Sequence, residues 1–197
     1  MSAFRAVWVD EGNDADVAKL ARHGIDSPYF SVRDPSVTAT YLQEVFEEGF
    51  TPGVYAAWNW YGGDGRKFAE QVDWELKRIG WLGNPPVCLD IETHDVGYIL
   101  AALKRWRELR PRRTTDMTLE GYQGGLFSPA QVLLVSSRVR YTVPQAYTGT
   151  MQAFDAVDVA ADLAFHSFPP RAVKIFYDAA QLPVAWQGYA FTQGRLP

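Results

Sequence analysis

A chain of 197 residues, 47% of them hydrophobic, is long enough for one globular domain with a sizeable core, and we expect one domain that spans residues 1–197. The net charge of −4 at pH 7, without a long basic run, excludes nucleic acid as an expected partner. Cys88 is the only cysteine, which excludes an internal disulfide. No stretch resembles a signal peptide or a membrane span, so we expect no membrane partner and a protein that is cytoplasmic at synthesis.

Short apolar runs alternate with segments of helical periodicity along the whole chain. The helical spacing of Phe68, Val72, Leu76 and Ile79 is one example, and Ser128-Pro129 is a typical helix start. Further helices are expected around residues 17–21, 41–46, 99–106 and 154–165. Strands are expected near residues 4–10, 29–32, 53–60, 87–92, 117–122, 142–147, 173–178 and 186–191.

Repeated strand–helix units with short apolar strands predict an α/β fold with a parallel sheet covered by helices. Eight such strands favour a single compact (β/α)8 TIM-like barrel in which the last helix is missing. No glycine-rich phosphate-binding motif follows a predicted strand, so no nucleotide and no other cofactor is expected.

Acidic residues stand at several predicted strand ends, which is where barrel active sites are built. These residues are Asp10, Asp34, Asp90 with Glu92, Glu120, and Asp178. Because strand side chains alternate, Asp90 and Glu92 are expected to face the barrel interior, while Leu89 and Ile91 face the helices. Asp34, which precedes a proline, is instead expected to bind the backbone of its own loop.

Two neighbouring carboxylates push each other's pKa values apart, and the one with the raised pKa can donate a proton near neutral pH. Glycoside hydrolysis needs such a pair. Glu92, with the longer side chain, is the candidate general acid, and Asp90 would orient it or stabilise positive charge on the substrate. Asp10 and Glu120 are candidates for the second catalytic role. The Asp90-x-Glu92-x-His94 spacing could also bind a metal ion, but His94 is expected in the following loop, so no metal is expected.

Aromatic and amide side chains at the same strand ends are the candidate substrate-binding residues. They are Trp58, Asn59, Trp60, Tyr122, Gln145 and Tyr147, with Asp178 as a weaker candidate. The Trp58–Trp60 cluster is interpreted as a platform on which sugar rings stack, and the alternative is a cluster that anchors its loop.

Three further features have plain structural interpretations. Trp74 and Trp106 lie on predicted helices and are expected to fill the core. The run Arg110-Pro111-Arg112-Arg113 lies between a helix and a strand and is interpreted as a solvated turn.

Residues 53–58, 68–74 and 86–92 resemble the glycoside hydrolase family 25 barrels, the muramidase-type lysozymes, and the related barrels of phage tail proteins. The first strand ending at Asp10, the Gly121-Tyr122 pair and residues 144–147 are similar to other strands of that family. The resemblance implies that Glu92 is the general acid with Asp90 and Asp10 as partners. The substrate that it implies is the glycan of bacterial peptidoglycan.

The sequence also departs from the family pattern, because residues 186–191 carry no acid and Asp10 is followed by Glu11-Gly12. Two hypotheses therefore stand. The favoured one is a glycosidase that acts on cell-wall glycan. The alternative is a non-catalytic barrel that binds glycan or forms part of a phage tail, with other virion tail proteins as partners and a virion-associated location.

Overall fold

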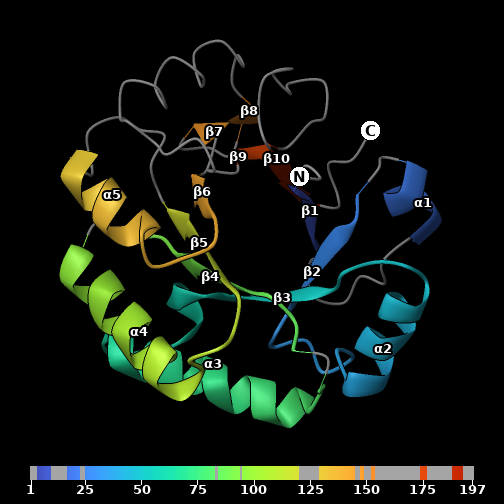
Figure 1. Ribbon diagram of the computed structural model, residues 1–197, viewed down its shortest axis with the longest axis horizontal. Coiled ribbons are helices and arrows are strands. Elements are labelled where there is room, and N and C mark those ends of the chain that lie inside the picture. Colours follow the sequence, from blue (N-terminus) through green and yellow to red (C-terminus); the bar gives the residue numbers. More distant parts are fainter. Residues whose placement is uncertain are drawn as a thin grey trace.

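The computed structural model describes residues 4–9, 17–22, 25–82, 84–93, 95–119, 129–144, 147–148, 152–153, 174–176 and 188–192. Eight of the strands form one parallel sheet in the order β6-β5-β4-β3-β2-β1-β10-β9 (Figure 1). Residues of β6 and β9, the two ends of this order, have Cα atoms within 8 Å of each other, so the sheet curls back on itself. The predicted (β/α) barrel is confirmed.

All eight predicted strands lie in this sheet. Their bounds are β1 (Phe4–Val9), β2 (Ser27–Ser31), β3 (Gly53–Ala57), β4 (Val87–Ile91), β5 (Thr115–Leu119), β6 (Thr142–Pro144), β9 (Lys174–Phe176) and β10 (Gly188–Thr192). The fifth strand begins at Thr115, earlier than the predicted start at Met117.

Three of the described helices begin after a residue whose side chain caps the first turn. The described helices are α1 (Val17–Arg22), α2 (Ala39–Glu47), α3 (Gly65–Ile79), α4 (Val96–Leu109) and α5 (Pro129–Ser136). The carboxylates of Asp64 and Asp95 accept hydrogen bonds from the third backbone N–H of α3 and α4, at 3.0 and 3.1 Å. Gly80 ends α3 in the left-handed conformation, with φ of 72°, which glycine adopts without strain. None of the helices within the described ranges is long and apolar enough to span a membrane.

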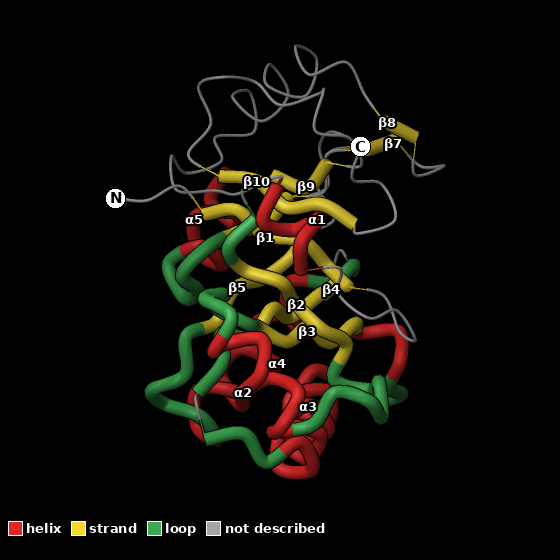
Figure 2. Tube along the Cα trace, turned by 90° about the vertical axis from the view of Figure 1, so that its right-hand side faces the viewer, coloured by secondary structure: helices red, strands yellow, loops and turns green. Residues whose placement is uncertain are grey.

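The main hydrophobic core lies between the sheet and the helices. Figure 2 shows α2, α3 and α4 gathered on one side of the strands β2, β3 and β4. Phe68 and Val72 of α3 and Trp106 of α4 are buried there, as their helical spacing predicts. Trp74 is 58% exposed, so the expectation that it fills the core is wrong. It follows Val72 by two positions, about 200° around the helix, and therefore faces solvent.

A second, smaller cluster fills the barrel interior, and it contains a buried charge. Tyr29 and Cys88 belong to this cluster. The hydroxyl of Tyr29 donates to Asp116 Oδ2 at 2.7 Å, and Arg140 donates to both carboxylate oxygens, at 2.9 and 2.6 Å. The N–H of Tyr141 adds a fourth donor at 3.2 Å. Arg140 and Tyr141 precede β6, so this network closes the N-terminal end of the barrel.

Two local predictions were wrong and one cannot be assessed. Trp58–Trp60, expected at the end of a strand, forms the 3-10 helix η1. Tyr147, expected in the sixth barrel strand, lies in β7 (Tyr147–Thr148), which pairs antiparallel with β8 (Gln152–Ala153) outside the barrel sheet. The predicted helix at residues 154–165 lies outside the described residues.

The first turn of α3 packs so closely on α4 that it accepts only glycine. A Cβ atom built on Gly65 would lie 2.9 Å from the backbone nitrogen of Ala102 and closer still to the carbonyl oxygen of Tyr98. Both obstacles are backbone atoms, so a side-chain rotation cannot relieve the clash.

We therefore predict that Gly65→Ala lowers the free energy of unfolding by about 1–3 kcal/mol, because the two helices must separate. Gly62→Ala is the matched control, since a Cβ there meets nothing within 4 Å. Urea denaturation followed by circular dichroism measures both variants. Equal stability of Gly65→Ala and Gly62→Ala would contradict the close contact between α3 and α4.

Candidate functional site

Asp90 faces the barrel interior, as predicted. Val87, Leu89 and Ile91 belong to the core between sheet and helices, whereas Cys88 belongs to the interior cluster. Alternation along β4 places Asp90 on the same side as Cys88 and nearer the C-terminal end of the strand. The carboxyl group therefore lies at the end of the barrel where active sites are built.

The surroundings of Asp90 offer it little compensation for burial. The strand register places Ala57 of β3 on one side and Thr118 of β5 on the other. Its Oδ1 atom is buried and has no hydrogen-bond partner within the described part of the chain. Burial, and secondly the negative charge of Glu92, raise the pKa of Asp90 to about 7, and a hydrogen bond with the Thr118 hydroxyl only partly offsets them.

Asp116 shows what a fully compensated carboxylate looks like in the same barrel. It pairs in register with Cys88, so it lies one layer below Asp90 toward the N-terminal end. Its side chain is 1% exposed, and Arg140, Tyr29 and the Tyr141 N–H satisfy both of its oxygens. Two acids thus share one interior: Asp116 is ion-paired, whereas Asp90 has no ion-pair partner in the described ranges.

Glu92 follows the end of β4 and is half-buried, close enough for its charge to act on Asp90. Glu92 was the predicted general acid, but Asp90 is the member of the pair whose pKa is raised to about 7. The geometry therefore favours the reverse assignment, with Asp90 as the proton-transfer group and Glu92 as the charge that tunes it.

Several other predicted site residues lie outside the described residues. They are Asp10, Glu120, Tyr122, Gln145 and Asp178, together with His94. The backbone of Tyr147 is described in β7, which is not part of the barrel sheet. Their predicted roles are therefore untested.

The aromatic residues after β3 pack inward against their neighbours. The ring of Trp58 meets the ring of Tyr98 in α4 edge-on, with centroids 6.2 Å apart. The ring centroid of Trp60 lies 5.5 Å from that of Tyr55, which belongs to the interior cluster. Both tryptophans are partly buried, and Asn59 between them is exposed. This packing favours the alternative interpretation, in which the cluster anchors the loop between β3 and α3.

The remaining described acid at a strand end has the structural role that was expected. Asp34 Oδ1 accepts hydrogen bonds from the backbone N–H and the hydroxyl of Ser36, at 2.8 and 2.7 Å. Thr118 is the residue that the sequence analysis missed. Its position two residues before Glu120 places it on the same strand face, which is the signal that could have identified it.

The chemistry open to this arrangement is proton transfer. A carboxyl group with a pKa near 7 exists in both protonation states at neutral pH, as a general acid or base requires. Carboxylate oxygens could also bind a hard divalent cation. No cluster of three or more His, Cys, Asp or Glu residues suited to a metal occurs among the residues that the structure describes.

No family model matches this sequence, and no curated protein sequence matches it significantly. Solved structures are similar in fold. The 2,3-dimethylmalate lyase of the PEP mutase/isocitrate lyase superfamily has a TM-score of 0.55 at 15% identity, over 96% of this chain and 75% of that one. A Burkholderia cenocepacia protein assigned as a lyase/mutase has a TM-score of 0.57 at 12% identity, over 97% and 77%. A Coccidioides immitis protein assigned as a deoxyribose-phosphate aldolase has a TM-score of 0.57 at 8% identity, over 98% and 82%.

These similarities establish the fold and correct the expected family. The similar structures are lyase, mutase and aldolase barrels, not family 25 muramidases, so the predicted relationship to lysozymes is wrong. The two functional hypotheses that followed from this relationship, a peptidoglycan glycosidase and a barrel of a phage tail, lose their support as well. The sequence resemblance rested on short strand segments, and strand segments of this kind recur across barrels with unrelated functions. The chain is a (β/α) barrel of the architecture shared by these enzymes.

The raised pKa of Asp90 makes the stability of the protein depend on pH. An acid whose pKa rises on folding binds its proton more tightly in the folded state, so folding weakens as pH rises from about 4 through 7. We predict that the free energy of unfolding falls by about 2–3 kcal/mol between pH 5 and pH 8, and that Asp90→Asn abolishes this decrease.

Asp64→Asn is the matched control, because asparagine caps a helix as well as aspartate does, and it should retain the decrease. The neighbouring thiol of Cys88 does not produce the same slope, because burial raises its pKa well above the usual value. Thermal unfolding at several pH values measures the effect. A slope shared by the wild type and Asp90→Asn would contradict the raised pKa.

Proposed function

We propose that this protein is an enzyme of the lyase or aldolase type, in which Asp90 acts as the general acid–base at the C-terminal mouth of the barrel. The observation that carries the proposal is the half-buried Asp90 side chain, whose carboxyl group has a pKa of about 7 and whose buried Oδ1 atom has no partner among the described residues. Burial of an uncompensated carboxyl group costs stability and is characteristic of catalytic sites.

The proposed reaction is cleavage of a carbon–carbon bond next to a carbonyl group. Ionised Asp90 takes the proton from a substrate hydroxyl two carbons from the carbonyl. That oxygen forms a new carbon–oxygen double bond as the bond between its carbon and the carbon next to the carbonyl breaks, and the electron pair of the broken bond forms the enolate. Protonated Asp90 then returns the proton to the carbon next to the carbonyl. The negative charge of Glu92 keeps Asp90 basic enough for the first step.

The reaction class draws on two further points. The solved structures of similar fold include a 2,3-dimethylmalate lyase and a protein assigned as a deoxyribose-phosphate aldolase. Aldol chemistry can also use a lysine that forms a Schiff base with the substrate. In the described barrel strands the one lysine is Lys174, the first residue of β9 (Lys174–Phe176). It therefore stands at the N-terminal end of its strand, whereas barrel active sites lie at the C-terminal ends. Lys67, Lys77 and Lys104 lie on helices. The described part of the barrel therefore favours the carboxylate route.

The test measures proton exchange, because exchange does not require the full substrate. The protein is incubated in D2O with 2-oxo acids, 2-hydroxy acids and sugar phosphates, and deuterium entry next to the carbonyl is followed by NMR. We predict that Asp90→Asn slows exchange at least about 100-fold, whereas Asp64→Asn leaves it unchanged. Absence of exchange with every compound, or full activity in Asp90→Asn, would reject the proposal.

The pH profile separates the roles of the two carboxylates. Exchange by the wild type should rise with pH to a plateau, with a midpoint near 7, as Asp90 ionises. Glu92→Gln removes the repulsive charge, so the pKa of Asp90 falls and the midpoint moves to lower pH while activity persists. A complete loss of exchange in Glu92→Gln at every pH would instead make Glu92 the catalytic group.

A further inference from the structure

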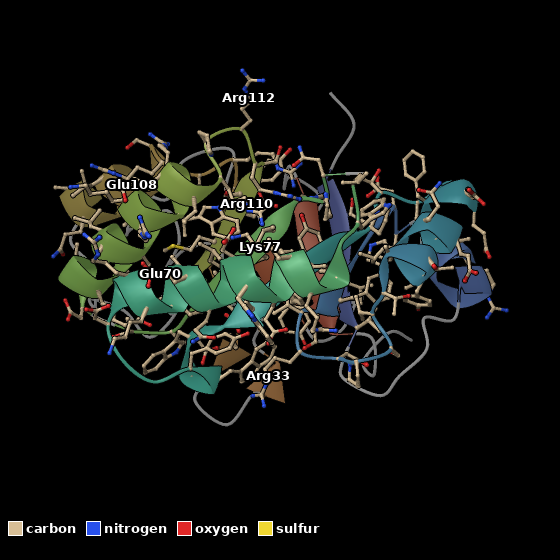
Figure 3. All side chains as sticks on the ribbon, turned by 90° about the horizontal axis from the view of Figure 1, so that it is seen from below. Arg33, Glu70, Lys77, Glu108, Arg110 and Arg112 are labelled. Carbon is tan, nitrogen blue, oxygen red and sulfur yellow. The ribbon has the colours of Figure 1, made fainter. Side chains whose placement is uncertain are left out.

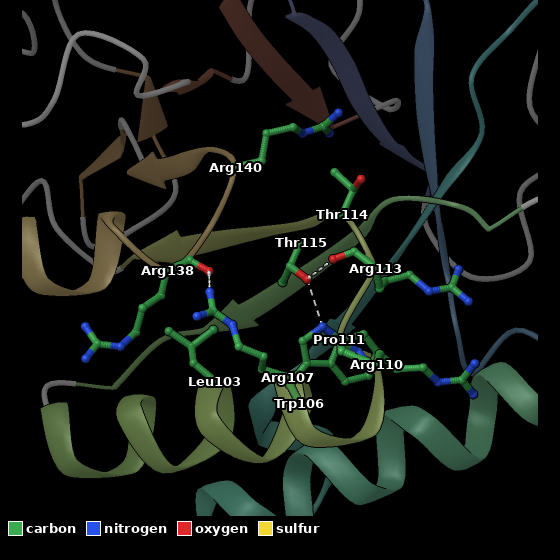
Figure 4. A pocket seen from close by; sticks show the side chains of 10 residues that line it. All are labelled: Leu103, Trp106, Arg107, Arg110, Pro111, Arg113, Thr114, Thr115, Arg138 and Arg140. Atoms are coloured by element: carbon green, nitrogen blue, oxygen red, sulfur yellow. Dashed lines mark hydrogen bonds between the residues drawn. The ribbon is translucent and has the colours of Figure 1, made fainter.

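A pocket of about 310 Å³ opens at the end of the barrel opposite to Asp90. It lies between the C-terminal part of α4, the connection from α4 to β5, and the turn between α5 and β6 (Figure 4). Both connections lead into the N-terminal ends of strands, whereas barrel active sites lie at the C-terminal ends. The pocket is therefore separate from the proposed catalytic site.

Arginine dominates the lining of this pocket. Five of the residues that line it are arginines, and none is acidic: Arg107, Arg110, Arg113, Arg138 and Arg140. In Figure 4, Arg107 lies near the centre of this group, with Arg138 on one side and Arg110 and Arg113 on the other. We call these five residues the arginine pocket.

Two of these positive charges are neutralised by partners outside the pocket. Arg110 pairs with Asp73 of α3, with Nε and Oδ1 2.5 Å apart, and Arg140 pairs with Asp116. The solvated turn expected at residues 110–113 is therefore correct for the exposed Pro111 and Arg112, of which Arg112 projects away from the ribbon in Figure 3. Arg110 and Arg113 are partly buried.

The other three guanidinium groups have no acidic partner in the described residues. Arg107 donates to the carbonyl oxygen of Arg138 at 3.3 Å, Arg138 donates to that of Leu134, and Arg113 donates to that of Pro85 at 2.9 Å. Carbonyl oxygens satisfy donors but do not neutralise charge. Arg107 and Arg138 are exposed and Arg113 is partly buried, and in Figure 4 the side chains of Arg138 and Arg113 extend to opposite sides of Arg107. The residues that line the pocket thus carry about three positive charges without a paired acid in the described residues, beside a space large enough for a small molecule.

Arg113 shows that this excess is costly. Its Nε atom is buried without a hydrogen-bond partner in the part of the chain that is described. Burial, and secondly the charge of Arg110, lower the pKa of Arg113 to about 10. A bound anion would supply both the missing acceptor and the missing negative charge.

We propose that the arginine pocket binds the phosphate group of a small molecule. A phosphomonoester carries a charge of about −1.5 to −2 at pH 7 and presents three strong acceptor oxygens, which suits several guanidinium groups better than a single carboxylate does. The pocket volume is at the lower end of the usual range of roughly 300–1,000 Å³ for small-molecule sites. The ligand is therefore a compact phosphate compound, bound away from the catalytic mouth.

Calorimetric titration of the full chain at constant ionic strength tests this proposal. Inorganic phosphate and glycerol 3-phosphate are the probes, and their relative affinities distinguish the free ion from a phosphate ester as the preferred ligand. We expect saturable binding to one site. Arg107→Gln should weaken binding at least tenfold, because Arg107 loses only one long hydrogen bond to a carbonyl and the fold should persist.

Arg112→Gln is the matched control, since Arg112 lies in the same connection, is exposed and does not line the pocket. Its affinity should stay within twofold of the wild type. Circular dichroism establishes that both variants are folded. The proposal is overturned if no saturable binding occurs below 10 mM of either probe, if Arg107→Gln binds as tightly as the wild type, or if Arg112→Gln loses as much affinity as Arg107→Gln.

Discussion

The structure depends on how a barrel interior accommodates ionisable side chains. Transfer of a carboxylate from water into an apolar interior is strongly unfavourable unless a positive charge or hydrogen-bond donors meet it. Asp116 meets this condition through Arg140, Tyr29 and a backbone N–H, and it ties β2, β5 and the start of β6 together at the N-terminal end. Asp90, one layer above, meets it only in part, through the Thr118 hydroxyl, and has no positively charged partner among the residues that the structure describes. The interior therefore holds an ion-paired acid at its N-terminal end and a weakly compensated acid toward its C-terminal end.

This asymmetry links the fold to the proposed chemistry. Asp116 links the strands through its ion pair with Arg140 and its hydrogen bond from Tyr29. Asp90 is held by the same strands in a position where its proton is weakly retained at neutral pH. The burial of Asp90 lowers the free energy of unfolding, and the hydrophobic core around it offsets this loss. Val54, Leu89 and Met117 of that core are fully buried. A rigid scaffold that carries one reactive group is the general arrangement of barrel enzymes.

Much of this could be predicted from the sequence, for identifiable reasons. The positions of the barrel strands followed from short apolar runs. The inward direction of Asp90 followed from the alternation of side chains between the two faces of the strand from Cys88 to Ile91. Relationships between distant residues could not be predicted in the same way. The contact between Tyr29 and Asp116 spans 87 residues and depends on strand register. The arginine pocket forms only when two connections, well separated in the sequence, meet at one end of the barrel.

The same limit explains why the structure favours other roles for two sets of predicted site residues. Glu92 was chosen as the general acid for its longer reach, but burial decides which carboxyl group has the raised pKa, and burial is a property of the folded chain. The tryptophans after β3 were interpreted as a sugar platform because they are aromatic and follow a strand. The structure shows that Trp58 and Trp60 pack against Tyr98 and Tyr55 instead.

The pKa of Asp90 is the quantity on which this account rests, and NMR can measure it directly. The carboxyl carbon of Asp90 can be followed across a pH titration of the protein labelled with carbon-13, and the signal is assigned by its disappearance in Asp90→Asn. The account predicts a titration midpoint near 7. A midpoint near 4, the value of an ordinary solvated aspartate, would contradict both the buried environment of Asp90 and its proposed role in proton transfer.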